Sequence, residues 1–132
     1  MSIWSWFGPD KLKKCEARAR KEPDNPQVQF ELGTEYERRG LNHQAIEAFL
    51  KTLEHNPRSA ESHFNLGVLY ETVDNGRQAI FHMAQAGNLF SERNDTANKD
   101  KARSKLKAYY QQFNQPPGRS SAAPDPSPGG SA

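Results

Sequence analysis

The sequence predicts an all-α protein built as a solenoid of stacked helical hairpins. Two stretches, FELGTEYERRGLNHQAI at 30–46 and FNLGVLYETVDNGRQAI at 64–80, match in phase at a spacing of 34 residues. Within each stretch, large apolar residues recur at intervals of three and four, which is typical of one helix face. A period of this length fits two helices of about three to four turns each, joined by tight turns. We therefore expect one helical hairpin per repeat and no β-strand.

The N-terminal part, residues 1–22, combines an aromatic segment with a capping helix at 10–22. Leu12, Cys15 and Ala19 lie 34 residues before Ile46, Phe49 and Leu53, so this helix resembles the second helix of a repeat that lacks its first. The preceding stretch IWSWF carries three closely spaced aromatic side chains: Trp4, Trp6 and Phe7. Three roles are open for them, namely an irregular cap folded over the first helix, a contact with a partner, or a membrane-surface anchor next to several lysines.

Two repeats follow, at 26–59 and 60–93. Their expected helices are 26–40, 43–56, 60–73 and 77–91. Pro57 cannot continue a helix and ends the first repeat. Glycine inside a helix costs about 1 kcal/mol relative to alanine, so Gly33 and Gly67 at equal phase need a structural reason. We expect Gly33 to let the second helix approach closely near Ala45.

The C-terminal part divides into a capping helix and a tail. Residues 94–114 carry an apolar stripe of Ala102, Leu106, Tyr109 and Phe113 on an otherwise basic helix, expected at 95–114, that should cover the second repeat. Residues 115–132 contain five prolines and no large apolar side chain, so we expect a disordered tail.

Composition narrows the functional classes. Net charge is +2, with an acidic centre between basic ends, and this centre disfavours binding to a nucleic-acid backbone. The single cysteine fits a reducing compartment, and no apolar run resembles a signal sequence or a membrane span, so we expect a cytosolic protein. No metal-ligand spacing, phosphate loop or catalytic motif is present, and the histidines are interpreted as surface or packing residues. We therefore expect no enzyme activity, cofactor or metal.

The repeated residues resemble the tetratricopeptide repeat. The first unit matches its pattern at Leu32, Gly33, Tyr36, Ala45, Phe49 and Pro57, and the second at Leu66, Gly67, Tyr70, Ala79 and Ala86. The departures include Gln29 and His63, which stand where an aromatic residue is usual. The resemblance implies a helical solenoid with two repeats between capping helices, and a concave groove on the free face of each first helix.

The groove that the resemblance implies contains nine residues. They are Gln27, Phe30, Thr34, Glu37, Glu61, Phe64, Asn65, Val68 and Glu71. The expected function is non-catalytic capture of a peptide or helix of a partner protein, with apolar and basic residues in the ligand because the groove combines aromatic and acidic side chains. The alternatives are a self-associating scaffold, whose oligomeric state the sequence leaves open, and a membrane-surface adaptor that uses Trp4, Trp6 and Phe7.

Overall fold

Six α-helices make up the part of the chain that the structure, a computed structural model, describes, residues 9–113. The helices are α2 (Pro9–Lys21), α3 (Pro26–Arg38), α4 (Asn42–His55), α5 (Ala60–Thr72), α6 (Gly76–Glu92) and α7 (Thr96–Phe113). Their bounds agree with the expected helices to within two residues, and the described part contains no strand. Trp4, Trp6, Phe7 and the expected tail lie outside the described residues.

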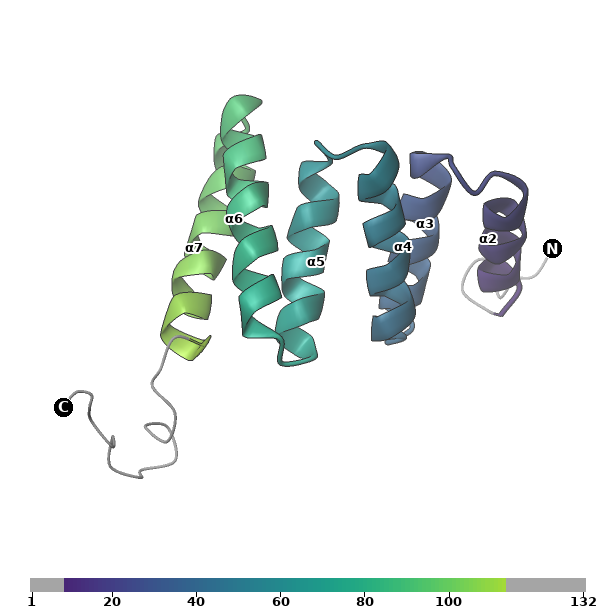
Figure 1. Cartoon of the computed structure of the whole chain (residues 1–132), viewed down its shortest axis with the longest axis horizontal. Helices are drawn as coiled ribbons and strands as arrows, with labels where there is room; N and C mark the ends of the chain where they lie inside the picture. The colour runs from purple at the N-terminus through teal and green to yellow at the C-terminus, as the bar shows by residue number, and fades with distance from the viewer. Residues whose placement is uncertain (1–8, 114–132) are drawn as a thin grey trace, which may run out of the picture.

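Each helix packs against the one that follows it in the sequence, from α2 at one end of the molecule to α7 at the other (Figure 1). Helices α3 and α4 form the first hairpin, and α5 and α6 form the second. Helix α2 covers one end of this pair and α7 covers the other. The fold is therefore an all-α solenoid of two helical hairpins with capping helices at both ends. None of the helices described for residues 9–113 is long and apolar enough to cross a membrane.

Side-chain caps and left-handed turns separate the helices. Asn25, Ser59, Asn75 and Asp95 each accept a hydrogen bond from a backbone N–H in the first turn of the next helix. Gly40 and Asp74, one repeat apart, have φ values of +75° and +62° directly after the first helix of each hairpin. Glycine adopts this conformation freely and aspartate tolerates it, so the same turn closes both hairpins.

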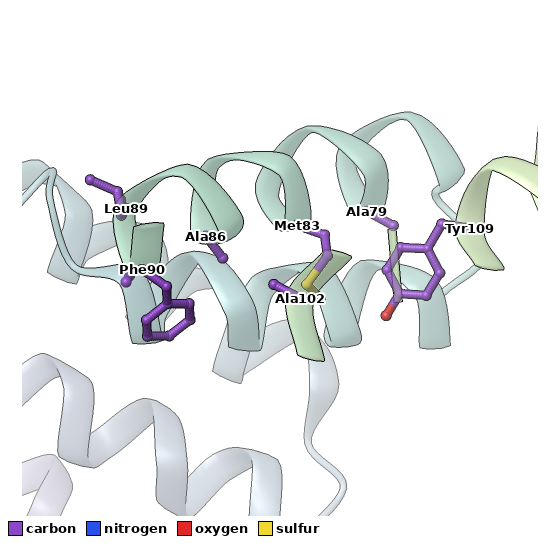
Figure 2. Close-up of a cluster of buried hydrophobic side chains, with 8 residues drawn as sticks. Ala79, Met83, Ala86, Leu89, Phe90, Ala102 and Tyr109 are labelled. Carbon is purple, nitrogen blue, oxygen red and sulfur yellow. The ribbon is translucent and has the colours of Figure 1, made fainter. Parts of the chain in front are cut away.

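Three contiguous clusters of buried apolar residues run along the array. The cluster at the C-terminal end joins α5, α6 and α7; Figure 2 shows Ala79, Met83, Ala86 and Phe90 of α6 beside Ala102 and Tyr109 of α7. The middle cluster joins α4 and α5 around Phe49 and Leu66. The N-terminal cluster joins α2, α3 and α4 through Ala19, Val28, Leu32 and Ala48. Small residues at these contacts let the helix backbones approach closely.

The two in-phase glycines each meet a large side chain of the second helix. A Cβ on Gly33 would lie 2.9 Å from Phe49 Cε1, and a Cβ on Gly67 would lie 2.7 Å from Met83 Cε. The nearest side chain lies one turn further along α4 than Ala45, where the Phe49 ring fills the space that Gly33 leaves. Since Phe49 and Met83 are one repeat apart, the same contact recurs in both hairpins.

A pair of buried histidines joins α5 to α6. The Nδ1 atoms of His63 and His82 lie 3.0 Å apart, and His63 Nε2 donates to the Pro57 carbonyl at 3.3 Å. A neutral His63 therefore has a bare Nδ1, which accepts the hydrogen bond that His82 Nδ1–H donates. The His82 ring also stacks on Tyr70, with the two ring planes 8° apart.

Burial lowers the pKa of both imidazoles. It lowers the pKa of His82 to about 4, with the neighbouring His63 adding to the effect. The pKa of His63 also falls through burial, although its hydrogen bond to Pro57 opposes the shift. Protonation of His63 would place hydrogens on both facing Nδ1 atoms, and protonation of His82 would bury a charge. The neutral pair is therefore the form that the fold stabilises.

The glycine contact predicts opposite effects for two Gly→Ala substitutions inside helices. Gly33→Ala should destabilise the fold, because overpacking against the fully buried Phe49 ring costs about 1 to 3 kcal/mol and exceeds the gain in helix propensity. Gly87→Ala is the matched control, since its Cβ would meet atoms only at 3.7 and 3.8 Å; it should stabilise by about 0.5 to 1 kcal/mol. Urea unfolding measures both, and shifts of equal sign would contradict the contact.

The histidine pair predicts that acid destabilises the protein. Because the folded-state pKa values lie below the ordinary value of 6.5, the unfolded chain binds more protons as the pH falls from 6.5 toward about 4. The free energy of unfolding should then decrease with a slope of up to about 1.4 kcal/mol per pH unit for each proton.

Urea unfolding between pH 8 and pH 5 tests the upper part of this window, where ordinary aspartate and glutamate side chains are still mostly ionised. His82→Gln should flatten the profile, whereas His43→Gln, which removes an exposed histidine, should leave it unchanged. Equal wild-type stability at pH 7 and pH 5 would refute the assignment.

Candidate binding surface

Two adjoining hollows between the first helices contain five of the nine sequence-predicted residues. One hollow, of about 330 Å³, is lined by Pro26, Gln27, Phe30, Thr52, Asn56, Ser59 and Glu61. The other, of about 200 Å³, is lined by Glu61, Phe64, Asn65, Phe90, Asn98 and Lys101. Because Glu61 lines both, they form one surface that crosses α3, α5 and α7, which we call the groove.

Phe30 is the principal apolar side chain of the first hollow. Its position on α3 follows from the cap at Asn25 and from Pro26, which together start the helix. The ring is half-buried and meets the Phe49 ring edge-on, with 5.4 Å between the ring centroids. One side of Phe30 is thus held by the core while another faces the hollow, so the ring is a fixed apolar surface rather than a free side chain.

Phe64 has a more enclosed place than the sequence suggested. Its half-buried ring packs against the C-terminal cluster, and Lys101 Nζ of α7 lies 5.4 Å from the ring centroid. Val68, one turn further along α5, packs against the same cluster. Both residues therefore contribute to the stability of the second hairpin, and Phe64 also lines the second hollow.

The remaining predicted residues are spread over the same helices. Thr34 is exposed and lines a separate hollow between α2 and α3. Glu71 is half-buried beside Tyr109 of α7, and burial of Tyr109, together with the Glu71 carboxylate, raises the pKa of Tyr109 to about 12. Glu37 is half-buried near the end of α3, and burial raises the pKa of its carboxyl group. These three residues line neither hollow of the groove.

Arginine and lysine from the C-terminal part change the charge of the groove. Arg93 Nη2 donates to Glu61 Oε2 at 2.7 Å, and this hydrogen bond lowers the pKa of the Glu61 carboxyl group. Lys101 adds a second positive charge beside Phe64. Lys101 was not among the groove residues expected from the sequence. The groove is consequently less acidic than the residues of α3 and α5 alone suggest.

A shift of register explains why Lys101 enters the groove. Helix α5 begins 34 residues after α3, but α7 begins 36 residues after α5. The N-cap hydrogen bonds show the same offset of 36 residues. Ser59 accepts a hydrogen bond from the N–H of Ser62, and Asp95 accepts the equivalent bond from the N–H of Asn98. Helix α6 has 17 residues against 14 in α4, and this extra length displaces the start of α7. At an offset of 36, Lys101 corresponds to Asn65.

Three comparisons place this fold among known proteins. A family model described as tetratricopeptide repeat matches residues 48–97, which include the whole second hairpin. A crystal structure of MamA is similar with a TM-score of 0.56 at 21% identity, covering 77% of this chain and 68% of that one. Another crystal structure of MamA protein gives a TM-score of 0.57 at 20% identity, covering 84% of this chain and 73% of that one. The search of curated proteins finds no match.

The family match and the internal symmetry of the chain agree. The matched segment contains Gly67 and its contact with Met83, and the first hairpin repeats that contact with Gly33 and Phe49. The repeat motif, the hairpin fold and the family match therefore agree that residues 48–97 contain a tetratricopeptide repeat, and that the first hairpin is built in the same way.

Proposed function

We propose that the chain is a non-catalytic protein–protein interaction module whose groove binds a peptide or helix of a partner protein. The observation that supports it most directly is the hollow beside Phe30, where a ring held by Phe49 borders about 330 Å³ of open space. A rigid aromatic surface next to a cavity is the usual receptor for an apolar anchor of a ligand. The two hollows together have room for a few side chains rather than for a large cofactor.

The polar lining suits a peptide main chain. Gln27, Asn56 and Asn65 place side-chain amides along the groove, and an amide both donates and accepts hydrogen bonds. An extended peptide presents N–H and C=O groups at regular intervals, so such amides can bond it without selecting its sequence. In this proposal, selectivity comes from the apolar anchor on Phe30 and from charge.

The charge of the ligand follows from a carboxylate that has no cation partner among residues 9–113. Glu61 is already bonded to Arg93, so it offers little to a further positive group. Glu37 forms no ion pair within residues 9–113, and its raised pKa reflects a half-buried charge without compensation. Since Glu37 lies two turns from Phe30 on one helix face, about 10 Å along the axis, we propose a lysine or arginine of the ligand at that distance from the anchor.

Blocking the first hollow should abolish peptide binding without unfolding the protein. Peptides selected from a random display library on the intact chain would be measured by calorimetry against two variants of exposed residues. Asn56→Arg adds a long side chain to the hollow, and Gln44→Arg makes the same charge change on α4 away from the groove. Because anchors commonly contribute about 2 kcal/mol or more, Asn56→Arg should weaken binding at least about tenfold.

The control and the composition of the selected peptides complete this test. Gln44→Arg should bind like the wild type, and the peptides should share an apolar residue with a basic residue near it. The proposal fails if Asn56→Arg, folded as judged by circular dichroism, binds the selected peptides with wild-type affinity. It also fails if the library yields no binding peptide.

A further inference from the structure

Among the helices of residues 9–113, α2 has no preceding helix beside it, whereas α4 and α6 each have one. Helix α4 packs against α3, which precedes it, and against α5, which follows it. Helix α6 likewise packs between α5 and α7. Helix α2 has the sequence phase of α4, yet within residues 9–113 it packs mainly against α3, which follows it, with a smaller contact to α4 at Ala48. A place equivalent to that of α3 is therefore open beside α2.

This open place is a hollow of about 540 Å³ between α2 and α3, which we call the N-terminal slot. Cys15 and the Phe30 ring line it, and Cys15 is the counterpart of Phe49 one repeat earlier. In the first hairpin, Phe49 is covered by Phe30; in the slot, Cys15 is half-buried and has no such cover among the described residues. The slot is thus short of large apolar side chains.

The rim of the slot is charged, but its charges are largely paired. Arg18 Nη1 lies 3.0 Å from Glu31 Oε1, and Lys11 Nζ lies 3.9 Å from the buried Glu35 carboxylate. Burial works to raise the pKa of Glu35, but hydrogen bonds from Arg38 and Arg39 outweigh it and hold that pKa below its usual range. Lys14, which also lines the slot, has no ion pair within residues 9–113 but is exposed to solvent. A neutral apolar segment can therefore enter without breaking the ion pairs of the rim.

We propose that the segment Ile3 to Phe7 of the same chain occupies the N-terminal slot, where it replaces the missing first helix as a strap. Residues 1–8 carry no ionisable side chain and contain Trp4, Trp6 and Phe7, which supply the large apolar groups that the slot lacks. The segment joins α2 directly at Pro9, so it reaches the slot without crossing another element.

Chain length permits this arrangement. Eight extended residues span up to about 26 Å, whereas the ten residues from Pro9 to Arg18 rise only about 14 Å along α2. The strap can therefore double back along α2 and still reach the middle of the slot. A strap from the same chain also closes at no cost in translational entropy, which a second copy or a partner would have to overcome.

The chain carries its own reporters for this proposal, none of which needs a peptide ligand. Trp4 and Trp6 are its only tryptophans, so tryptophan emission reports on the strap alone. Cys15 is its only cysteine and lines the slot, so its reaction rate with a thiol reagent such as dithiobisnitrobenzoate reports on whether the slot is covered.

Replacement of the strap aromatics should uncover the thiol. In Trp4→Ala/Trp6→Ala/Phe7→Ala, the Cys15 reaction rate should rise at least about tenfold and the melting temperature should fall, whereas Ser5→Ala should match the wild type. In the intact chain, tryptophan emission should be blue-shifted, resist acrylamide quenching and stay constant on dilution. Thr34→Arg, which crowds the slot from an exposed position, should shift that emission to the red.

Several results would overturn the strap. The proposal fails if Cys15 reacts with the thiol reagent at the same rate in the triple variant and in the wild type. It also fails if the tryptophans of the native chain are fully solvated. If the protection of Cys15 and of the tryptophans disappears on dilution, a second copy of the chain occupies the slot instead. If the tryptophans are protected only when phospholipid vesicles are present, the aromatic side chains bind a membrane surface instead.

Discussion

The contact between a helix glycine and a large side chain of the next helix determines the geometry of the whole array. In each hairpin, the missing Cβ of Gly33 or Gly67 leaves room for Phe49 or Met83, so the two helices pack closely along their middle turns. This orientation turns the opposite side of α3 and α5 away from their own hairpin. Phe30 and Phe64 contact their own hairpin on one side and border the groove, next to the following unit, on the other. The packing inside each hairpin thus decides which residues remain for a ligand.

Periodicity in the sequence predicted the helices well because it depends on local spacing. A face of a helix follows from residues three and four apart, and the bounds of all six helices came within two residues. The sequence did not show which side chain meets Gly33, because phase identifies a face but not the turn at which two helices cross. His63 and His82, 19 residues apart, could not be recognised as a pair from spacing within one helix.

The binding surface was less predictable than the fold for the same reason. The residues on α3 and α5 follow from the 34-residue phase, but Lys101 enters the groove only because α6 is longer than α4. Arg93 reaches Glu61 across 32 residues, from the turn that ends α6. A sequence comparison of the two cap positions, Ser59 and Asp95, contains the signal for this shift, since an N-cap marks where a helix begins. The phase of the repeat alone therefore does not predict the charges that a neighbouring unit contributes to the groove.

The unequal clusters along the array have a consequence for how it opens. The C-terminal cluster contains Met83, Phe90 and Tyr109, whereas no buried residue of the N-terminal cluster is larger than leucine. In a linear array each unit is held only by its neighbours, so local unfolding begins where the interface is weakest. Amide hydrogens of α2 and α3 should then exchange through partial opening, while those of α6 exchange only when the whole array unfolds. The molecule has a graded stability along its length, with its most labile unit next to the Phe30 side of the groove.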